Sequence, residues 1–130
     1  MHLLTKASDE RALSRGMLGL SVRIARALNG LWKRSGSVFV DRFHARLLKT
    51  PREVRNALVY VLQNARKHTP SISFRPDSYS SGAWFDGWKA NVEKVAESGS
   101  AFLARARTWL LGVGWKRHGL IDPRELPSSA

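Results

Sequence analysis

The sequence has no cysteine among its 130 residues. This absence excludes disulfides, thiolate zinc sites and cysteine nucleophiles together, and leaves four histidines, with carboxylates and amides, as metal ligands. It also lacks any apolar run that approaches the ~20 residues of a membrane-spanning helix, and its mean hydropathy is −0.29. The N-terminus lacks the charged, apolar and small-residue order of a secretory signal. We therefore expect a cytoplasmic, single-domain-sized protein that does not bind a membrane.

Acidic residues are scarce. The chain has 10 Asp and Glu against 22 Lys and Arg, which gives a net charge of +12 and a pI near 11.3. Such an excess predicts a polyanionic partner, and the alternative is a generally basic composition without one. Residues 1–68 hold 14 Lys and Arg against 4 Asp and Glu, whereas residues 69–130 hold 8 against 6. The sequence therefore predicts the binding face in the first half.

An amphipathic helix is predicted between Asp9 and Arg34. Its apolar residues recur at spacings of three and four, at Leu13, Met17, Leu20, Ile24, Leu28 and Leu31. Ser8 or Asp9 is expected to cap it, and Gly30 to end or kink it. The opposite face carries Arg15, Arg23, Arg26 and Arg34. One side of this helix is thus expected to pack while the other presents positive charge.

Two segments have the composition of strands. Residues 2–5 form a short stretch with two leucines, Leu3 and Leu4, and are expected to be the end of a strand. Residues 38–48 are rich in β-branched and aromatic side chains and follow a turn signal at residues 34–37. This second segment is predicted to be either a hairpin that turns at Asp41 and Arg42 or one bent strand.

A second helix is predicted to begin at Thr50-Pro51-Arg52-Glu53, a capping box with proline at the first helical position, and to run to about His68. Its predicted core stripe comprises Val54, Ala57, Leu58, Val61 and Ala65. Tyr60 and Asn64 lie on the other side, one turn apart, so their polar groups can converge on one ligand. The alternative for Tyr60 is a surface tyrosine without a chemical role.

The remainder of the chain carries weaker signals. Residues 69–86 are predicted to form a loop. Trp84 and Trp88 are expected either to dock this region on the core or to stack on unpaired bases. A short helix is expected around residues 101–111, and the last eight residues are expected to fray.

Several of these segments resemble, in order, one enzyme family. They are His2-Leu3-Leu4, the basic helix, Arg34-Ser35-Gly36, residues 38–46, the capping box, and Tyr60-Val61-Leu62-Gln63-Asn64. Together they resemble the REP-associated, insertion-sequence-200-like branch of the HUH-type single-tyrosine transposases. The resemblance covers residues 2–68, a partial catalytic core. Residues 69–130 look like a family-specific C-terminal tail with a loop and a short helix.

The resemblance implies a fold and a chemistry. The implied fold is α+β, a ferredoxin-like antiparallel sheet with packed helices and with its first strand missing here. In the family, a His-hydrophobic-His strand holds a divalent metal and a helix presents a tyrosine. On this chain His2 matches the second histidine, Tyr60 the nucleophile and Asn64 the amide that completes the metal shell. The implied metal is Mg²⁺ or Mn²⁺, since a phenol of pKa ~10 is a poor nucleophile without help.

The chain also departs from the family pattern. The first histidine of the pair would fall before Met1, and Met1 stands at the intervening hydrophobic position. We therefore expect either a start assigned too late or a truncated transposase copy. Ala65 stands where many relatives have proline after the asparagine, which is expected to extend the helix.

The expected nucleic-acid contacts are basic side chains, at Arg23, Arg26, Arg34, Arg42, His44, Arg46, Arg66 and Lys67. For each of these cations taken alone, the alternative to a nucleic-acid contact is a solvated surface charge. For His44 the alternative is a partly buried side chain on a strand.

Three functions follow from the sequence as hypotheses. The first is a metal-dependent DNA transposase that cuts and rejoins hairpin or single-stranded DNA ends through a 5′-phosphotyrosine, without a small-molecule substrate. The second is a non-catalytic DNA- or RNA-binding protein, and the third is a decayed fragment. The expected location is the bacterial cytoplasm, at the nucleoid.

Overall fold

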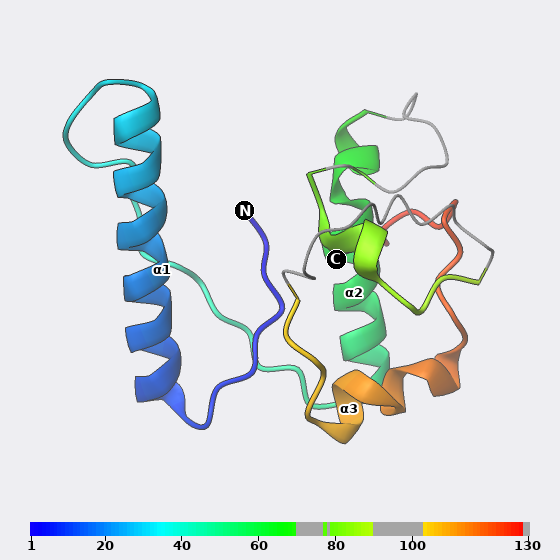
Figure 1. Ribbon diagram of the computed structural model, residues 1–130. Coiled ribbons are helices and arrows are strands. Elements are labelled where there is room, and N and C mark those ends of the chain that lie inside the picture. Colours follow the sequence, from blue (N-terminus) through cyan, green and yellow to red (C-terminus); the bar gives the residue numbers. More distant parts are fainter. Residues whose placement is uncertain (70–76, 78, 90–102, 129–130) are drawn as a thin grey trace. The chain divides into compact units, whose positions relative to one another are not determined.

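A computed structural model of the protein describes residues 1–69, 77, 79–89 and 103–128. Its elements in chain order are α1 (Glu10–Leu31), α2 (Pro51–His68), the 3₁₀ helix η1 (Ser81–Trp84), α3 (Trp109–Gly112) and the 3₁₀ helix η2 (Gly114–His118) (Figure 1). The chain divides into two compact units. Unit 1 comprises Met1–Leu4 and Leu48–Ala130, and unit 2 comprises Thr5–Leu47.

The predicted ferredoxin-like antiparallel sheet is wrong. In the described part of the chain, β pairing is confined to one isolated parallel bridge between Trp88 and Ile121. Residues 2–5 and 38–48, the predicted strands, join no β ladder there. β-Propensity measures how well a side chain fits a pleated, half-buried surface, so it makes a strand only where partner strands supply that surface. The described architecture is helical.

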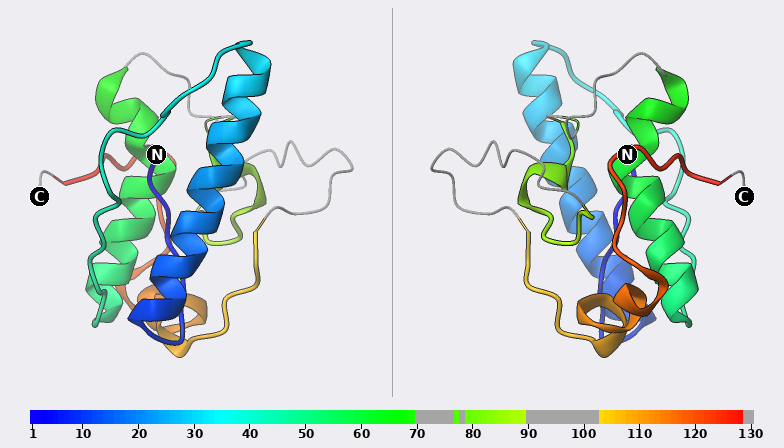
Figure 2. Two further views of the ribbon diagram at one scale, coloured as in Figure 1. Left: turned by 90° about the vertical axis from the view of Figure 1, so that its left-hand side faces the viewer. Right: turned by 90° about the vertical axis from the view of Figure 1, so that its right-hand side faces the viewer.

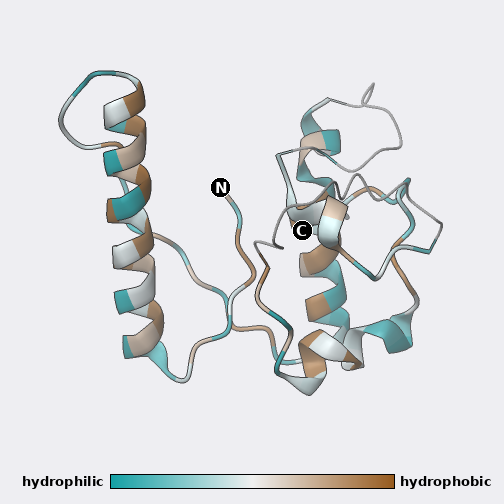
Figure 3. Cartoon of the chain, in the orientation of Figure 1, coloured by the Kyte–Doolittle hydropathy of each residue, from teal (hydrophilic) through white to brown (hydrophobic). Residues whose placement is uncertain are grey.

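Unit 2 is built on α1. The Asp9 carboxylate accepts from the backbone N–H of Ala12 at 2.7 Å, which confirms Asp9 as the cap. The helix runs through Gly30 and ends at Leu31, where Lys33 and Gly36 take positive φ values of 50° and 102° and turn the chain. None of its residues, all of which the structure describes, is buried. Hydrophobic residues nevertheless recur along one side of α1, as the sequence predicted (Figure 3).

In unit 1, α2 begins and ends where the sequence predicted. The Thr50 hydroxyl accepts from the backbone N–H of Glu53 at 3.2 Å, and the Glu53 carboxylate accepts from the backbone N–H groups of Thr50 and Lys49 at 3.0 and 2.8 Å. Pro51 occupies the first turn, where its missing N–H costs no hydrogen bond. These contacts fix the start of the helix that carries Tyr60.

The core of unit 1 is a cluster of buried apolar side chains, at Val54, Leu58, Val59, Leu62, Trp115 and Ile121. The four residues from α2 show that its buried face is turned by roughly a quarter of a turn from the predicted stripe, towards Val59 and Leu62. The predicted stripe members Ala57, Val61 and Ala65 are only half-buried. The shift arises because Trp115 and Ile121 cover this side of α2, and no local pattern in residues 51–68 announces them.

Aromatic rings pack beside this core. Phe85 stacks on Trp115 at 5.6 Å between ring centroids and meets Trp88 edge-on at 5.3 Å. The Trp88 indole N–H donates to the carbonyl of Gly82 at 2.9 Å. Trp88 therefore docks on the fold. Gly87 allows this packing, since a Cβ there would lie 2.5 Å from Cζ of Phe85 and 2.7 Å from Cζ2 of Trp115.

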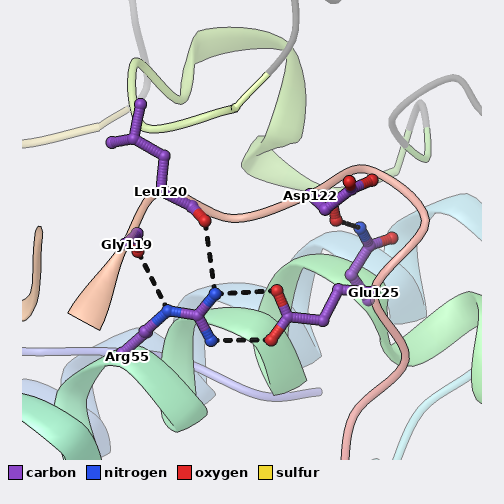
Figure 4. Close-up of polar contacts among 6 residues, drawn as sticks. Arg55, Gly119, Leu120, Asp122 and Glu125 are labelled. Atoms are coloured by element: carbon purple, nitrogen blue, oxygen red, sulfur yellow. Dashed lines mark hydrogen bonds and ion pairs between the residues drawn. The ribbon is translucent and has the colours of Figure 1, made fainter.

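The C-terminal segment is held on α2 by polar contacts (Figure 4). Arg55 forms a two-pronged ion pair with Glu125, with N–O distances of 2.6 and 2.8 Å, and also donates to the carbonyls of Gly119 and Leu120 at 2.9 and 3.2 Å. Gln63 donates to the carbonyl of Pro123 at 3.0 Å. The guanidinium of Arg55 lowers the pKa of Glu125 through this hydrogen bond. Residues 123–125, predicted to fray, are thus anchored.

The predicted helix at 101–111 forms only near its end. Residues 101 and 102 lie outside the described part, residues 103–108 are not helical, and α3 begins at Trp109. The hydroxyl of Thr108 accepts from the backbone N–H of Leu111 at 3.3 Å and caps this short helix. Figure 2 shows α3 and η2 beside the N-terminal end of α2 from two sides, and both contact it. Within the described residues, no helix is both long and apolar enough to span a bilayer.

Candidate functional site

Tyr60 and His2 meet in unit 1. Tyr60 projects from α2 on the side away from Val59 and Leu62, and it is half-buried. The imidazole of exposed His2 lies against it, with ring centroids 4.8 Å apart and planes at 85°, an edge-to-face contact. Leu4 packs against the core and holds the N-terminal residues in this unit. The structure therefore brings together two residues that are far apart in the sequence and that the resemblance singled out.

Asn64 follows Tyr60 by one helical turn, on the same side of α2. Its Oδ1 atom is covered by protein and has no hydrogen-bond partner among the described residues. An amide oxygen without a partner costs about 1–3 kcal/mol when it is buried, so such atoms are uncommon and often belong to a ligand site. The helical spacing places Asn64 on the same face of α2 as Tyr60.

The chemistry of His2 and Asn64 is compatible with the implied divalent metal. An imidazole nitrogen and an amide oxygen are both accepted ligands of Mn²⁺, and Mg²⁺ commonly takes few protein ligands and completes its shell with water and substrate phosphates. The unpartnered Oδ1 of Asn64 agrees with such a role. No group of three or more His, Cys, Asp or Glu able to hold a metal occurs in the described part of the chain. By their chemistry, His2 and Asn64 therefore fit a partial ligand set that water and a bound phosphate would have to complete.

Most of the predicted nucleic-acid contacts lie in unit 2 and are exposed: Arg23, Arg26, Arg34, Arg42, His44 and Arg46. Arg34 is partly committed to the turn after α1, since its guanidinium donates to Asn29 and to the carbonyl of Ser37, each at 3.3 Å. His44 is on an exposed extended segment rather than partly buried on a strand. Unit 2 holds nine Lys and Arg against three Asp and Glu, and it therefore presents a strongly positive surface.

The two remaining predicted contacts are on α2. Arg66 is buried, with 8% of its surface exposed, and its guanidinium donates to the carbonyl of Pro123. This side chain belongs to the packing of the C-terminal segment, which the helical wheel of α2 alone does not reveal. Lys67 lies in the last turns of α2, and its side chain is outside the described part.

Sequence reasoning missed a basic and aromatic surface around α3 and η2. Trp109, Lys116 and Arg117 are all exposed there, as are Arg105 and Arg107 just before α3. Residues 103–119 contain four Lys and Arg and no Asp or Glu. Averaging the charge over residues 69–130 concealed this local run, which a shorter window would have found.

No protein-family model, curated protein or solved structure matches this chain.

Proposed function

We propose that this protein binds DNA at a hairpin or single-stranded end and that Tyr60 is the nucleophile that cuts and rejoins the strand, as in the transposases that the sequence resembles. The observation that carries the proposal is the meeting of the Tyr60 and His2 rings at 4.8 Å, with the unpartnered Oδ1 of Asn64 one turn further along α2. A tyrosine beside two potential metal ligands suits phosphoryl transfer better than it suits a purely structural role.

The proposed reaction is a transesterification. The Tyr60 oxygen bonds to phosphorus while the bond from phosphorus to the 3′-oxygen of the preceding nucleotide breaks. The phenol proton leaves and the released 3′-oxygen takes up a proton, so the products are a 5′-phosphotyrosine and a 3′-hydroxyl. Attack by a 3′-hydroxyl on this linkage reverses the step and rejoins the strand without ATP.

His2 and Asn64 would hold the divalent metal, Mg²⁺ or Mn²⁺, which supplies charge neutralisation and orientation at the phosphate when bound. The contact with His2 restricts the rotation of the Tyr60 ring, so less orientational freedom is lost when the phosphate arrives. The exposed cations of unit 2 supply contacts to the phosphate backbone. A DNA partner would place this protein at the bacterial nucleoid.

The experiment is covalent capture on a pool of labelled hairpin and single-stranded oligonucleotides with Mg²⁺ or Mn²⁺, read as a denaturation-resistant band. We expect the band with the wild type, its loss in Tyr60→Phe, and its retention in Tyr79→Phe, because Tyr79 is 97% exposed and is the matched control. His2→Ala and Asn64→Ala are expected to reduce the band and leave DNA binding within about twofold. A band that persists in Tyr60→Phe would exclude Tyr60 as the nucleophile.

A second candidate is DNA binding without catalysis. It is favoured by the helical architecture, because the described residues lack the paired strands that present the metal ligands in the resembled family. Oligonucleotide binding by the wild type together with no covalent band under any metal condition would select this second function over the first.

A further inference from the structure

Trp109 stands out among the tryptophans of unit 1. It opens α3 and keeps 51% of its surface exposed, whereas Trp115 in the adjoining η2 is 2% exposed and belongs to the core. The packing of unit 1 accounts for Trp115, whose indole N–H also donates to the carbonyl of Leu111 at 3.0 Å. It does not account for a large aromatic surface left in water at Trp109.

The Trp109 ring is held in place although it is exposed. Gly114 lies directly against its six-membered ring, since a Cβ on Gly114 would come within 2.7 Å of Cζ3 and 2.9 Å of Cε3. The guanidinium of Arg117 lies over the ring, with its central carbon 5.0 Å from the ring centroid. A ring that is fixed before binding loses little conformational freedom when a flat ligand stacks on it.

The charges around Trp109 have one sign along the chain. Four Lys and Arg occur in residues 103–119, all exposed: Arg105, Arg107, Lys116 and Arg117. Lys116 has an acidic neighbour in Asp86, whose carboxylate is exposed and lies 4.0 Å from the Lys116 ammonium. In the described part of the chain, Arg117 makes no hydrogen bond or ion pair, so its guanidinium is available to move from the ring face to a phosphate when a base stacks there.

An exposed tryptophan with a guanidinium on its ring and further exposed cations near it in the sequence is an arrangement that suits unpaired nucleic acid. The ring stacks on a base, which every nucleotide offers once its strand is single, and the cations contact the phosphates on either side. Duplex DNA would engage the cations and leave the ring unused, because its bases are already stacked. An acidic peptide would likewise satisfy the charges and leave the ring unexplained.

We propose that Trp109 is a stacking platform for an unpaired base of single-stranded DNA, with Arg117 and Lys116 contacting the phosphates that flank it. The inference rests on the proposed function in so far as the protein binds DNA. It adds a site that does not depend on Tyr60 or a metal, and it gives the C-terminal segment a part in recognising the unpaired strand. It also predicts a preference for single-stranded over duplex DNA.

The test measures the affinity of the full chain for a fluorescent 20-nucleotide dT strand and for a duplex of equal length, without divalent metal. We expect Trp109→Ala to weaken single-strand binding by roughly 5-fold to 100-fold, to change duplex binding less than about twofold, and Trp109→Phe to retain most of the affinity. Arg117→Gln is expected to reduce the slope of log affinity against log salt by about one.

Trp32→Ala is the matched control. Trp32 is 53% exposed, and the central guanidinium carbon of Arg34 lies over its ring, 5.3 Å from the centroid. Unlike Arg117, Arg34 is already engaged in hydrogen bonds to Asn29 and Ser37. Equal losses of single-strand affinity in Trp109→Ala and Trp32→Ala would overturn the assignment. So would a loss in Trp109→Ala that is equal for single-stranded and duplex DNA. An unchanged single-strand affinity in Trp109→Ala, with the wild type binding DNA, overturns the stacking site alone. Failure of the wild type to bind any oligonucleotide, or binding to anionic vesicles instead, overturns both proposals.

Discussion

At the scale of single residues, Arg55 and Glu125 form a charged contact between α2 and the C-terminal segment. Both side chains are mostly covered, with 15% and 30% of their surfaces exposed, and the pair is two-pronged. Such geometry makes a charge-assisted hydrogen bond stronger than a typical surface ion pair. The pair therefore contributes to the stability of unit 1, and its contribution depends on the ionisation of Glu125.

Glu125→Gln is expected to lower the free energy of unfolding by about 1.5 kcal/mol at pH 7. The folded protein holds the pKa of Glu125 below its ordinary value of 4.5, so the contribution is complete above that pH and is lost as the pH falls through the folded-state pKa. Urea unfolding of wild type and variant at pH 7 and at pH 3 measures this. Asp86→Asn, at a carboxylate with 80% exposure, is the control and is expected to change little.

A difference between the wild type and Glu125→Gln that stayed constant from pH 7 to pH 3 would show that the charge of Glu125 is not what stabilises the segment.

Gly87 provides a steric prediction. A methyl group there would collide with the rings of Trp115 and Phe85, so Gly87→Ala is expected to destabilise unit 1 by about 1–3 kcal/mol. Thermal unfolding followed by near-ultraviolet circular dichroism reports on this, because the affected rings are aromatic. Gly112→Ala is the control, since the nearest atom to its added Cβ would be the Cβ of Ala106, 3.9 Å away. Similar losses at the two positions would exclude overpacking as the cause.

At the scale of elements, the capping box decides where α2 begins and thereby where Tyr60 lies. Thr50→Ala removes the hydroxyl that accepts from the backbone of Glu53 and is expected to cost about 1 kcal/mol. Urea unfolding measures the loss, and Thr5→Ala, at an exposed residue of unit 2, is the control. An unchanged stability in Thr50→Ala would mean that tertiary packing alone holds this helix end.

Local signals predicted the two long helices α1 and α2 well, and the short C-terminal helix and the β structure badly. The caps at Asp9 and Thr50 act on backbone groups within three residues, so the sequence alone is sufficient to identify them. Residues 38–48 were predicted as strand because their side chains suit a sheet, but a strand also requires partners from elsewhere in the chain. The rotation of the buried face of α2 has the same origin, since Trp115 and Ile121 are remote in sequence.

In the candidate site too, local sequence predicts some features and remote segments determine the others. The alignment of Tyr60 and Asn64 follows from helical geometry, and the sequence predicted it. The contact between His2 and Tyr60 could not be predicted from helical or strand spacing, because the two residues are 58 positions apart in the sequence. The burial of Arg66 could not have been predicted, because its partner, the carbonyl of Pro123, is contributed by a segment without a recognisable pattern.

At the scale of the whole molecule, positive charge is shared by both units. Unit 2 has nine Lys and Arg against three Asp and Glu, and unit 1 has thirteen against seven, so each has a net charge of six. We expect DNA affinity to fall at least about tenfold between 50 and 200 mM salt because counterions are released on binding. A fluorescence titration at several salt concentrations measures the slope. An affinity insensitive to salt would contradict a phosphate-dominated interface.

The attachment of residues 119–125 to α2 also sets an order of events during synthesis. Arg55 and Glu125 are 70 residues apart, and the chain is made from its N-terminus, so α2 is complete long before the residues that cover it exist. Until then Val59 and Leu62 are exposed to the ribosome surface and to chaperones. Unit 1 is therefore expected to acquire protease resistance only after the residues up to Glu125 have been synthesised.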